Sequence, residues 1–362
     1  MSEPGLNHWR RANLTIDLAA LSHNFNRVRE YAPGCQVMAV IKANAYGHGM
    51  LAVADQLIDA DLFAVAMPSE AYALRAAGCE KPILVLHGFS DRHELEQFSR
   101  LNLSTAVYQQ SQLETLLAHS LTPPIDAWIK IDTGMHRLGV PVDEVDAYFG
   151  ELRKSKNVAN VFFMSHFANS DDISNTINNK QLNSFVNVIG DLGINCSMAN
   201  SAAIIKIPES HFEVVRPGIM LYGSSPFPDI PASDLGLRPV MQFESILIDI
   251  KQVKAGEAIG YGGTYTSDTD ITVGVVAAGY GDGYPRHARN GTPVWLNDQC
   301  CELVGRVSMD SLCINLTGVA ARVGDRVALW GKELSVDEVA RASDSIAYEL
   351  LCNAGAAYAA NR

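Results

Sequence analysis

The feature that most constrains the fold of this 362-residue chain is a series of short apolar runs separated by longer amphipathic stretches. Short apolar runs of this kind are typical of buried strands. The stretches between them resemble helices, and one begins at Ser69 and is followed by Gly78, as helix caps favour. The predicted strands cover residues 36–42, 62–66, 83–87, 104–108, 126–132, 161–167, 194–200 and 213–217, and the clearest predicted helices cover 69–77, 143–154 and 174–192. Strand–helix units in series predict an α/β fold with a (β/α)8 TIM barrel, and a doubly wound open sheet is the alternative.

The pattern changes after a proline-rich segment at residues 224–231, which is typical of a linker. The following apolar runs have no helices between them, so they predict a second, mainly β domain. These strands are expected at residues 241–251, 271–278, 292–296, 301–307, 311–316 and 326–330, with one helix at 335–351. We expect a barrel domain at residues 11–235 and a β domain at 236–362, and a first strand near 12–17 that pairs with the β domain.

Composition excludes several classes of function. A net charge of −12 argues against a nucleic-acid partner, which would favour a basic surface. The seven cysteines form no CxxC pair and no Cys/His metal spacing, so we expect free thiols, a reducing compartment and no metal. Residues 1–13 lack the apolar stretch of a signal peptide, and no window is apolar enough to span a membrane. The expected location is the cytoplasm.

Polar side chains stand where five of the predicted strands end, and the carboxyl ends of barrel strands are where active sites form. These residues are Lys42, Lys130, His166, Asn200 with Ser201, and Arg216. A single one of them could have a structural role, but together they predict a functional site. A desolvated lysine such as Lys42 can lose its proton and act as a nucleophile. The loops after the seventh and eighth strands often bind phosphate, which here points to Ser201, Gly218 and Ile219. A lysine amine opposite a phosphate site suggests pyridoxal 5'-phosphate (PLP), held as a Schiff base.

Eight separated motifs make the chain resemble the alanine racemase family, and they keep the family's order over nearly the whole sequence. They are AVIKANAYGHG (39–49), IKIDTGMHRLG (129–139), MSHFA (164–168), ANS (199–201), VRPGIMLYG (215–223), YGGTY (261–265), GYGDGY (279–284) and GRVSMD (305–310). The resemblance implies a PLP-dependent isomerase that interconverts L-alanine and D-alanine.

The resemblance also implies a two-base mechanism. Lys42 would bind PLP and act as the base for D-alanine, and Tyr265 would be the base on the opposite face. Because the pKa of a free tyrosine is near 10, Tyr265 needs a tuning neighbour, and His166 matches the residue in that role. Arg216 matches the arginine at the pyridine nitrogen, to which a guanidinium does not give up its proton.

The remaining roles follow from the same matches. The phosphate ligands would be Tyr46, Ser201, Gly218, Ile219 and Tyr348, and Asn200 belongs to the same cofactor site. Arg137, Met309 and Asp310 match the substrate side, and Lys130 matches a lysine that some members carry carbamylated. Tyr265 and Met309 reach the other subunit's site in this family, so the resemblance implies a homodimer with shared active sites.

Two departures from the family pattern stand out. Ser197 replaces a histidine that supports the pyridine-facing arginine in some members, and residues 352–362 lack the common Arg-Val-Pro ending. The glycine-rich residues 279–283 do not join a strand to a helix, as a nucleotide loop would.

The alternatives to an alanine racemase are a racemase with wider scope (serine, lysine or arginine), a related decarboxylase and a non-catalytic PLP carrier.

Overall fold

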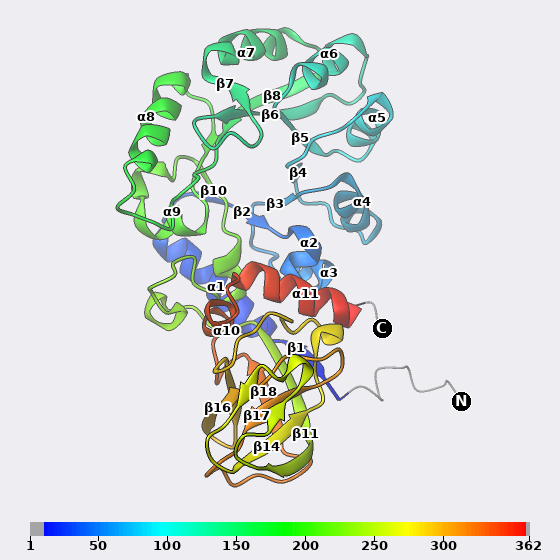
Figure 1. Ribbon diagram of the computed structural model, residues 1–362. Helices are drawn as coiled ribbons and strands as arrows, with labels where there is room; N and C mark the ends of the chain where they lie inside the picture. Colours follow the sequence, from blue (N-terminus) through cyan, green and yellow to red (C-terminus); the bar gives the residue numbers. More distant parts are fainter. Residues whose placement is uncertain (1–10, 191, 360–362) are drawn as a thin grey trace, which may run out of the picture. The chain divides into compact units, whose positions relative to one another are not determined.

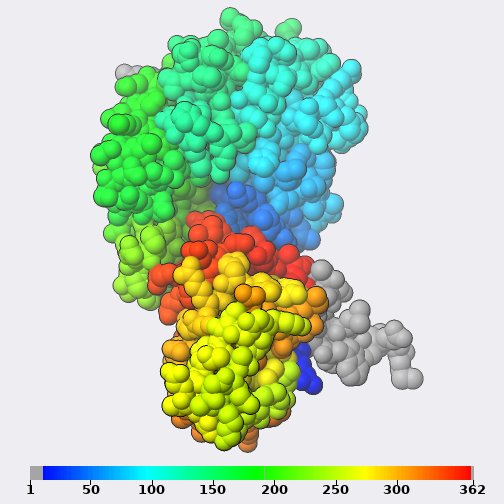
Figure 2. Space-filling model, viewed as in Figure 1, coloured from blue at the N-terminus to red at the C-terminus, as the bar shows by residue number. Residues whose placement is uncertain are grey.

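The structure is a computed structural model that describes residues 11–190 and 192–359 (Figure 1). Its contacts divide the chain into two compact units. The barrel unit comprises Asn24–Ala45 and Met50–Leu221, and the β unit comprises the chain up to His23, Tyr46–Gly49 and the chain from Tyr222 onward. The boundary between the two units lies between residues 221 and 222. The expected domain boundary lies later in the sequence, between residues 235 and 236. In Figure 2 the barrel unit runs mainly from blue to green and the β unit mainly from yellow to red.

Eight parallel strands form the barrel unit and stand in the order β10-β2-β3-β4-β5-β6-β8-β9, with short β7 (Val140–Pro141) beside β6. They are β2 (Gln36–Val40), β3 (Leu62–Val65), β4 (Ile83–Val85), β5 (Ser104–Val107), β6 (Ile125–Asp132), β8 (Val158–Met164), β9 (Cys196–Ser197) and β10 (Val214–Val215). The two ends of this series meet, because the Arg216 N–H donates to the Ala199 carbonyl at 2.9 Å. All eight predicted strands and the TIM barrel are confirmed, and the open doubly wound sheet is wrong.

Helices follow most of these strands: α3 (Met50–Gln56), α4 (Pro68–Ala76), α5 (Arg92–Arg100), α6 (Gln110–Ala118), α7 (Val145–Lys154), α8 (Ile177–Ile189) and α9 (Ser201–Lys206). Before β2 lies α1 (Leu18–Tyr31). Each of α4 to α7 buries one leucine completely: Leu74, Leu95, Leu116 and Leu152. Burying such a side chain contributes about 1.5–3 kcal/mol, so these leucines fix the helices to the core. The three predicted helices are confirmed with small shifts of their ends.

The β unit is an antiparallel sheet with the strand order β1-β11-β14-β17-β16-β15-β18, and β18 also pairs with β11. Its strands are β1 (Asn13–Ile16), β11 (Met241–Val253), β14 (Ile271–Val276), β15 (Pro293–Leu296), β16 (Gln299–Leu303), β17 (Leu312–Asn315) and β18 (Arg326–Trp330). All six predicted strands are confirmed. β1 pairs with β11 in antiparallel register, with Asn13 opposite Glu244. A hairpin of β12 (Ala258–Ile259) and β13 (Tyr265–Thr266) was not predicted, because two-residue strands are too short to produce an alternating pattern.

The expected single helix at 335–351 is wrong. The structure has two helices, α10 (Val336–Ala342) and α11 (Ala347–Ala359). The chain turns between them at Asp344, whose φ of 53° lies in the left-handed region. The Ser345 N–H donates back to the Ala340 carbonyl at 3.0 Å, which closes the end of α10. Asp tolerates this conformation better than most residues.

Two expectations concern residues that lie partly outside the described ones. Most of the polar segment 1–13, and the last three residues of the divergent C-terminus, are outside them. Within residues 11–190 and 192–359, no helix is both long and apolar enough to cross a membrane.

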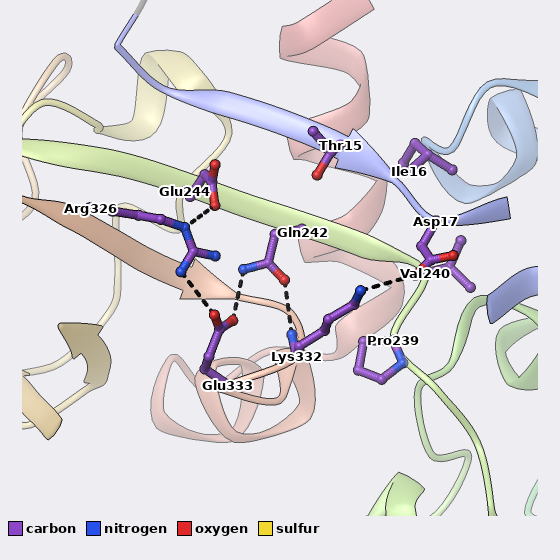
Figure 3. Close-up of a pocket in the computed structure, with 10 residues that line it drawn as sticks. All are labelled: Thr15, Ile16, Asp17, Pro239, Val240, Gln242, Glu244, Arg326, Lys332 and Glu333. Carbon is purple, nitrogen blue, oxygen red and sulfur yellow. Dashed lines mark hydrogen bonds and ion pairs between the residues drawn. The ribbon is translucent and has the colours of Figure 1, made fainter. Parts of the chain in front are cut away.

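A charged network ties β1, β11 and β18 together in the β unit (Figure 3). Arg326 on β18 pairs with Glu244 on β11 and with Glu333 at 2.8 Å. Gln242 donates to Glu333 at 2.9 Å and accepts the Lys332 N–H at 2.9 Å. The Lys332 ammonium in turn lies 3.1 Å from Asp17, just after β1. The network therefore links the N-terminal strand β1 to β18, the last strand in the sequence, across β11.

We predict that Arg326→Met lowers the free energy of unfolding of the β unit by about 1 kcal/mol at neutral pH, the upper range for a partly exposed ion pair. Burial alone would raise the pKa of Glu333, but hydrogen bonds from Arg326 and Gln242 hold it below its usual 4.5. A lowered carboxyl pKa stabilises the fold above the ordinary value and loses this effect as the pH falls through the folded-state value. The difference between variant and wild type in urea titrations should therefore shrink as the pH falls below the usual 4.5 and through the lowered folded-state value.

Arg322→Met is the matched control, because the Arg322 side chain is 89% exposed beside Asp325. It should leave the urea midpoint unchanged. An equal effect of both substitutions, or an Arg326 effect that persists in acid, would contradict the role given to the network.

Candidate active site

The barrel unit gathers positive charge where its parallel strands end. Lys42 follows β2, Lys130 lies in β6, and His166 and Arg216 follow β8 and β10. These cations lie near His166. Burial and the nearby charges of Arg216, Arg137, Lys130 and Lys42 hold the pKa of His166 well below the usual 6.5. The structure therefore brings together five of the predicted site residues of this unit and keeps the imidazole neutral.

Arg216 is buried, with 5% of its surface exposed, and its partners in the described chain are neutral. Its guanidinium donates to the Ser197 hydroxyl at 2.7 Å and to the Ser165 carbonyl at 2.5 Å, and lies 3.4 Å from Nδ1 of His166. Burial lowers the pKa of Arg216 to about 10, so the group stays charged at neutral pH.

Ser197 supports Arg216, although some members of the family have a histidine at this position. Its hydroxyl accepts from Arg216 and donates to the Val214 carbonyl at 2.6 Å. The Ser197 side chain is fully buried. A serine thus links the guanidinium to strand β10 in place of a larger imidazole.

Lys130 is also buried, with 8% of its surface exposed. Burial, followed by the charges of Arg216, Arg137 and Lys42, lowers its pKa to about 8. A substantial fraction of this amine is therefore neutral near pH 8. Arg137 lies on an exposed loop whose backbone is shaped by Asp132, which accepts the N–H groups of Gly134, Met135 and His136.

The loops after β9 and β10 meet at Ser201. Its hydroxyl accepts the backbone N–H of Gly218 at 2.9 Å and of Met220 at 3.3 Å. A hydroxyl has two acceptor positions and one donor, so these bonds leave the Ser201 O–H to donate elsewhere. The Gly218 N–H, expected to face a phosphate, is engaged by Ser201. Asn200 caps α9 by accepting the Ala203 N–H at 3.1 Å, so a structural role accounts for its position.

Tyr46 and Tyr348 both lie in the β unit. The Tyr46 ring stacks on Tyr222 with centroids 4.7 Å apart and lies 5.9 Å from the Tyr348 ring. Burial, with smaller contributions from Tyr348 and Cys352, raises the pKa of Tyr46 far above its usual 10. The phenol is therefore a neutral hydrogen-bond donor at every physiological pH.

Helix α11 packs on the segment that follows Tyr46. A Cβ on Gly47 would lie 2.3 Å from the Leu351 carbonyl oxygen, and one on Gly355 would lie 2.2 Å from Gly47. Only glycine allows two backbones to approach so closely. The divergent C-terminus thus has a defined contact with the motif that contains Lys42.

The remaining predicted residues of the β unit lie on the β12–β13 hairpin and on the loop between β16 and β17. Tyr265 is half-buried opposite Ile259, and Met309 is 54% exposed beside exposed Asp310. The Gly281 N–H donates to the Met309 carbonyl at 2.8 Å, and a Cβ on Gly279 would lie 2.3 Å from the Ser308 carbonyl. Gly279 and Gly281 therefore allow close contact with the Met309 loop. Within the described residues no group of His, Cys, Asp and Glu side chains is arranged to hold a metal.

Sequence reasoning missed the conformation of the chain after Lys42. Ala43, Asn44, Ala45 and Tyr46 form a left-handed turn with φ values of 54°, 52°, 55° and 52°. Such a conformation costs roughly 1–2 kcal/mol per residue that is not glycine. Asn44 is the one residue of this run that tolerates the left-handed conformation well, whereas the two alanines favour a right-handed helix.

Two family models match the chain. Alanine racemase, N-terminal domain, matches residues 16–226, and alanine racemase, C-terminal domain, matches residues 240–361. The alanine racemase of Aeromonas hydrophila is 47% identical over 338 residues, which are 93% of this chain and 95% of that protein. The biosynthetic alanine racemase of Escherichia coli K12 is 46% identical over 94% of this chain and 96% of its own length.

Among solved structures, the biosynthetic alanine racemase of Pseudomonas aeruginosa superimposes with a TM-score of 0.93 at 43% identity, over 95% of this chain and 97% of that one. Both halves of the sequence and the fold agree, and the chain therefore belongs to the alanine racemase family.

Proposed function

We propose that this protein is an alanine racemase that uses PLP and interconverts L-alanine and D-alanine. The observation that carries the proposal is the convergence of Lys42, Lys130, Arg137 and Arg216 on His166, in a family whose named members are alanine racemases. Four cations around a neutral imidazole favour an anionic ligand, and both PLP phosphate and a substrate carboxylate are anions.

The chemistry of the donor groups fits PLP. Buried Ser201 has an O–H left to donate to a phosphate oxygen, and the Ile219 N–H lies next to the Gly218 contact. By family resemblance Tyr46 and Tyr348 have the same ligand, and Asn200 positions Ser201 by capping α9. When bound, PLP withdraws electrons from the substrate α-carbon and makes its proton acidic.

The protein's own residues account for the rest of the reaction. Lys42 would take the α-proton of D-alanine from one face, and Tyr265 would take that of L-alanine from the other. Arg216 would bind the pyridine nitrogen without protonating it, because its pKa of about 10 keeps its proton in place at neutral pH. This limits how much negative charge the cofactor ring accepts. Arg137, Met309 and Asp310 would receive the substrate carboxylate.

We also infer a homodimer in which Tyr265 and Met309 contribute to the other subunit's site. The exposure of Tyr261 (67%), Met309 (54%) and Tyr280 (40%) in the single chain supports a covered face in an assembly. The family models end and begin on either side of the proposed domain boundary at 235/236. Seven free cysteines support a cytoplasmic location.

The direct test is deuterium wash-in at Cα. Wild-type protein with PLP should exchange the α-proton of both enantiomers in D2O. Tyr265→Phe should lower exchange into L-alanine by about 10²- to 10⁴-fold, the usual contribution of a general base, and should retain exchange into D-alanine through Lys42. The measurement is NMR of each enantiomer separately.

Tyr31→Phe, a change on the outer helix α1, is the control and should exchange both enantiomers like wild type. Equal losses for both enantiomers in Tyr265→Phe would rule out a face-specific base. Absence of exchange in the PLP-loaded wild type would overturn the proposed function itself.

A heterodimer test addresses the shared site. Lys42→Ala should lose the absorbance of the lysine–PLP adduct and racemisation together. Co-expressed with a differently tagged Tyr265→Phe chain and purified as a heterodimer, it should regain racemisation, because one of the two sites then has both bases.

A tagged heterodimer of two Lys42→Ala chains is the control and should stay inactive. If Lys42 and Tyr265 act within one chain, the mixed dimer has no intact site. Failure to regain activity would therefore refute the shared site and leave the two-base assignment standing.

We further propose that Lys130 is carbamylated. The neutral amine attacks CO2, a nitrogen–carbon bond forms and one proton is released, which leaves an anion among cations. Because burial and neighbouring charges lower the pKa of Lys130 to about 8, the modified fraction should rise as the pH increases through this value. Carbon-13 NMR with labelled bicarbonate should show one carbamate signal.

Lys130→Ala should abolish that signal, and Lys206→Ala, at an exposed lysine of α9, should retain it. A signal that is absent at every pH, or that survives in Lys130→Ala, would contradict the assignment.

A further inference from the structure

Glu70 joins two strand–helix units of the barrel next to Lys42. It lies in the first turn of α4, after β3, and β3 pairs with β2. One carboxylate oxygen, Oε1, accepts the Ala43 N–H at 2.6 Å. The other, Oε2, accepts the N–H groups of Ala66 at 2.8 Å and Met67 at 3.0 Å. Both oxygens are therefore used, and one side chain connects the residue after Lys42 to the end of the neighbouring strand.

The segment that Glu70 holds does not adopt its shape unaided. Ala43 begins the left-handed turn, in which L-residues are unfavourable. Within the segment itself, the Ala45 N–H donates to the Ile41 carbonyl at 2.9 Å and Asn44 accepts the Met50 N–H at 2.8 Å. Glu70 differs from these partners because it belongs to the next unit and is anchored by its own helix.

We propose that Glu70 is a positioning residue for Lys42: its carboxylate fixes the first peptide of the left-handed turn and so sets the direction of the Lys42 side chain at the barrel mouth. The inference rests on the proposed function, which assigns Lys42 as the PLP-binding base. It extends that function to a residue that does not itself contact cofactor or substrate.

A carboxylate is needed because both of its oxygens accept. In Glu70→Gln an NH2 group replaces one of the carboxylate oxygens. This group only donates, so it cannot accept the N–H of Ala43, or those of Ala66 and Met67, whichever it faces. Glu70→Asp retains the charge but is one methylene shorter, which withdraws its carboxylate from Ala43. Both variants should release the turn. Because a displacement of about 1 Å can cost 10²-fold in rate, racemisation should fall by roughly that factor.

The experiment is hydrogen exchange of the full-length protein, without PLP and after PLP is added. In both Glu70 variants, peptides covering residues 41–50 should exchange at least about tenfold faster than in wild type, as expected for one lost protecting hydrogen bond of about 1.4 kcal/mol. Peptides from β6 and β8 should remain unchanged. The absorbance of the lysine–PLP adduct should decrease in parallel.

Glu94→Gln is the matched control. Glu94 occupies the same place in α5, where its carboxylate accepts the Ser90 N–H and the Ser90 hydroxyl, both at 2.8 Å, after strand β4 rather than beside the turn. It should leave exchange at residues 41–50 and the adduct absorbance as in wild type. This comparison separates the loss of a helix-cap carboxylate from the loss of the contact with Ala43.

Unchanged exchange at residues 41–50 in Glu70→Asp would overturn the proposal, whatever the activity. The same pattern of exchange in Glu70→Asp and Glu94→Gln would also overturn it. If the Glu70 variants exchange faster at residues 41–50 but the wild type does not racemise alanine, the proposed function alone is refuted. The exchange measurement does not depend on catalysis.

Discussion

Parallel pairing of the barrel strands is the constraint on which the rest of the site depends. Strands that run the same way end at the same edge, so Lys42, Lys130, His166 and Arg216 meet although up to 174 positions separate them, from 42 to 216. This arrangement concentrates like charges in a partly buried space, where repulsion is weakly screened. Burial, followed by this repulsion, lowers the pKa values of Lys130 and His166. Binding of an anion would relieve this repulsion.

The backbone of the left-handed turn after Lys42 is strained. The left-handed conformation costs roughly 1–2 kcal/mol per residue. Four consecutive residues therefore cost more than one hydrogen bond contributes, which is about 0.5–1.5 kcal/mol net. The contacts of Ala43, Ala45 and Asn44 must therefore act together with the packing of Gly47 against α11. Strain of this size persists only where surrounding structure over-determines it, which is typical of functional sites.

The barrel could be predicted because each buried strand is a local apolar run, and the motifs at the strand ends placed Lys42, Lys130 and Arg216 on one edge. The contacts that orient these groups could not be predicted. Glu70 looks like an ordinary helix-cap residue, and Ser197 looks like a loss of support. The bond that each makes joins positions far apart in the sequence. The break at Asp344 was missed for a related reason: apolar spacing continues across it, while a single backbone angle ends the helix.

The partners of Arg216 decide what the arginine can do for the reaction. A carboxylate partner would neutralise the guanidinium and compete for its donors, whereas a hydroxyl and carbonyls orient it and leave its charge in place. Ser197 achieves this through one oxygen that both accepts from Arg216 and donates to Val214. A histidine in that place would carry a charge that varies with pH. Serine has no charge to gain or lose near neutral pH, so the hydrogen bond between Ser197 and Arg216 does not depend on a protonation step at this position.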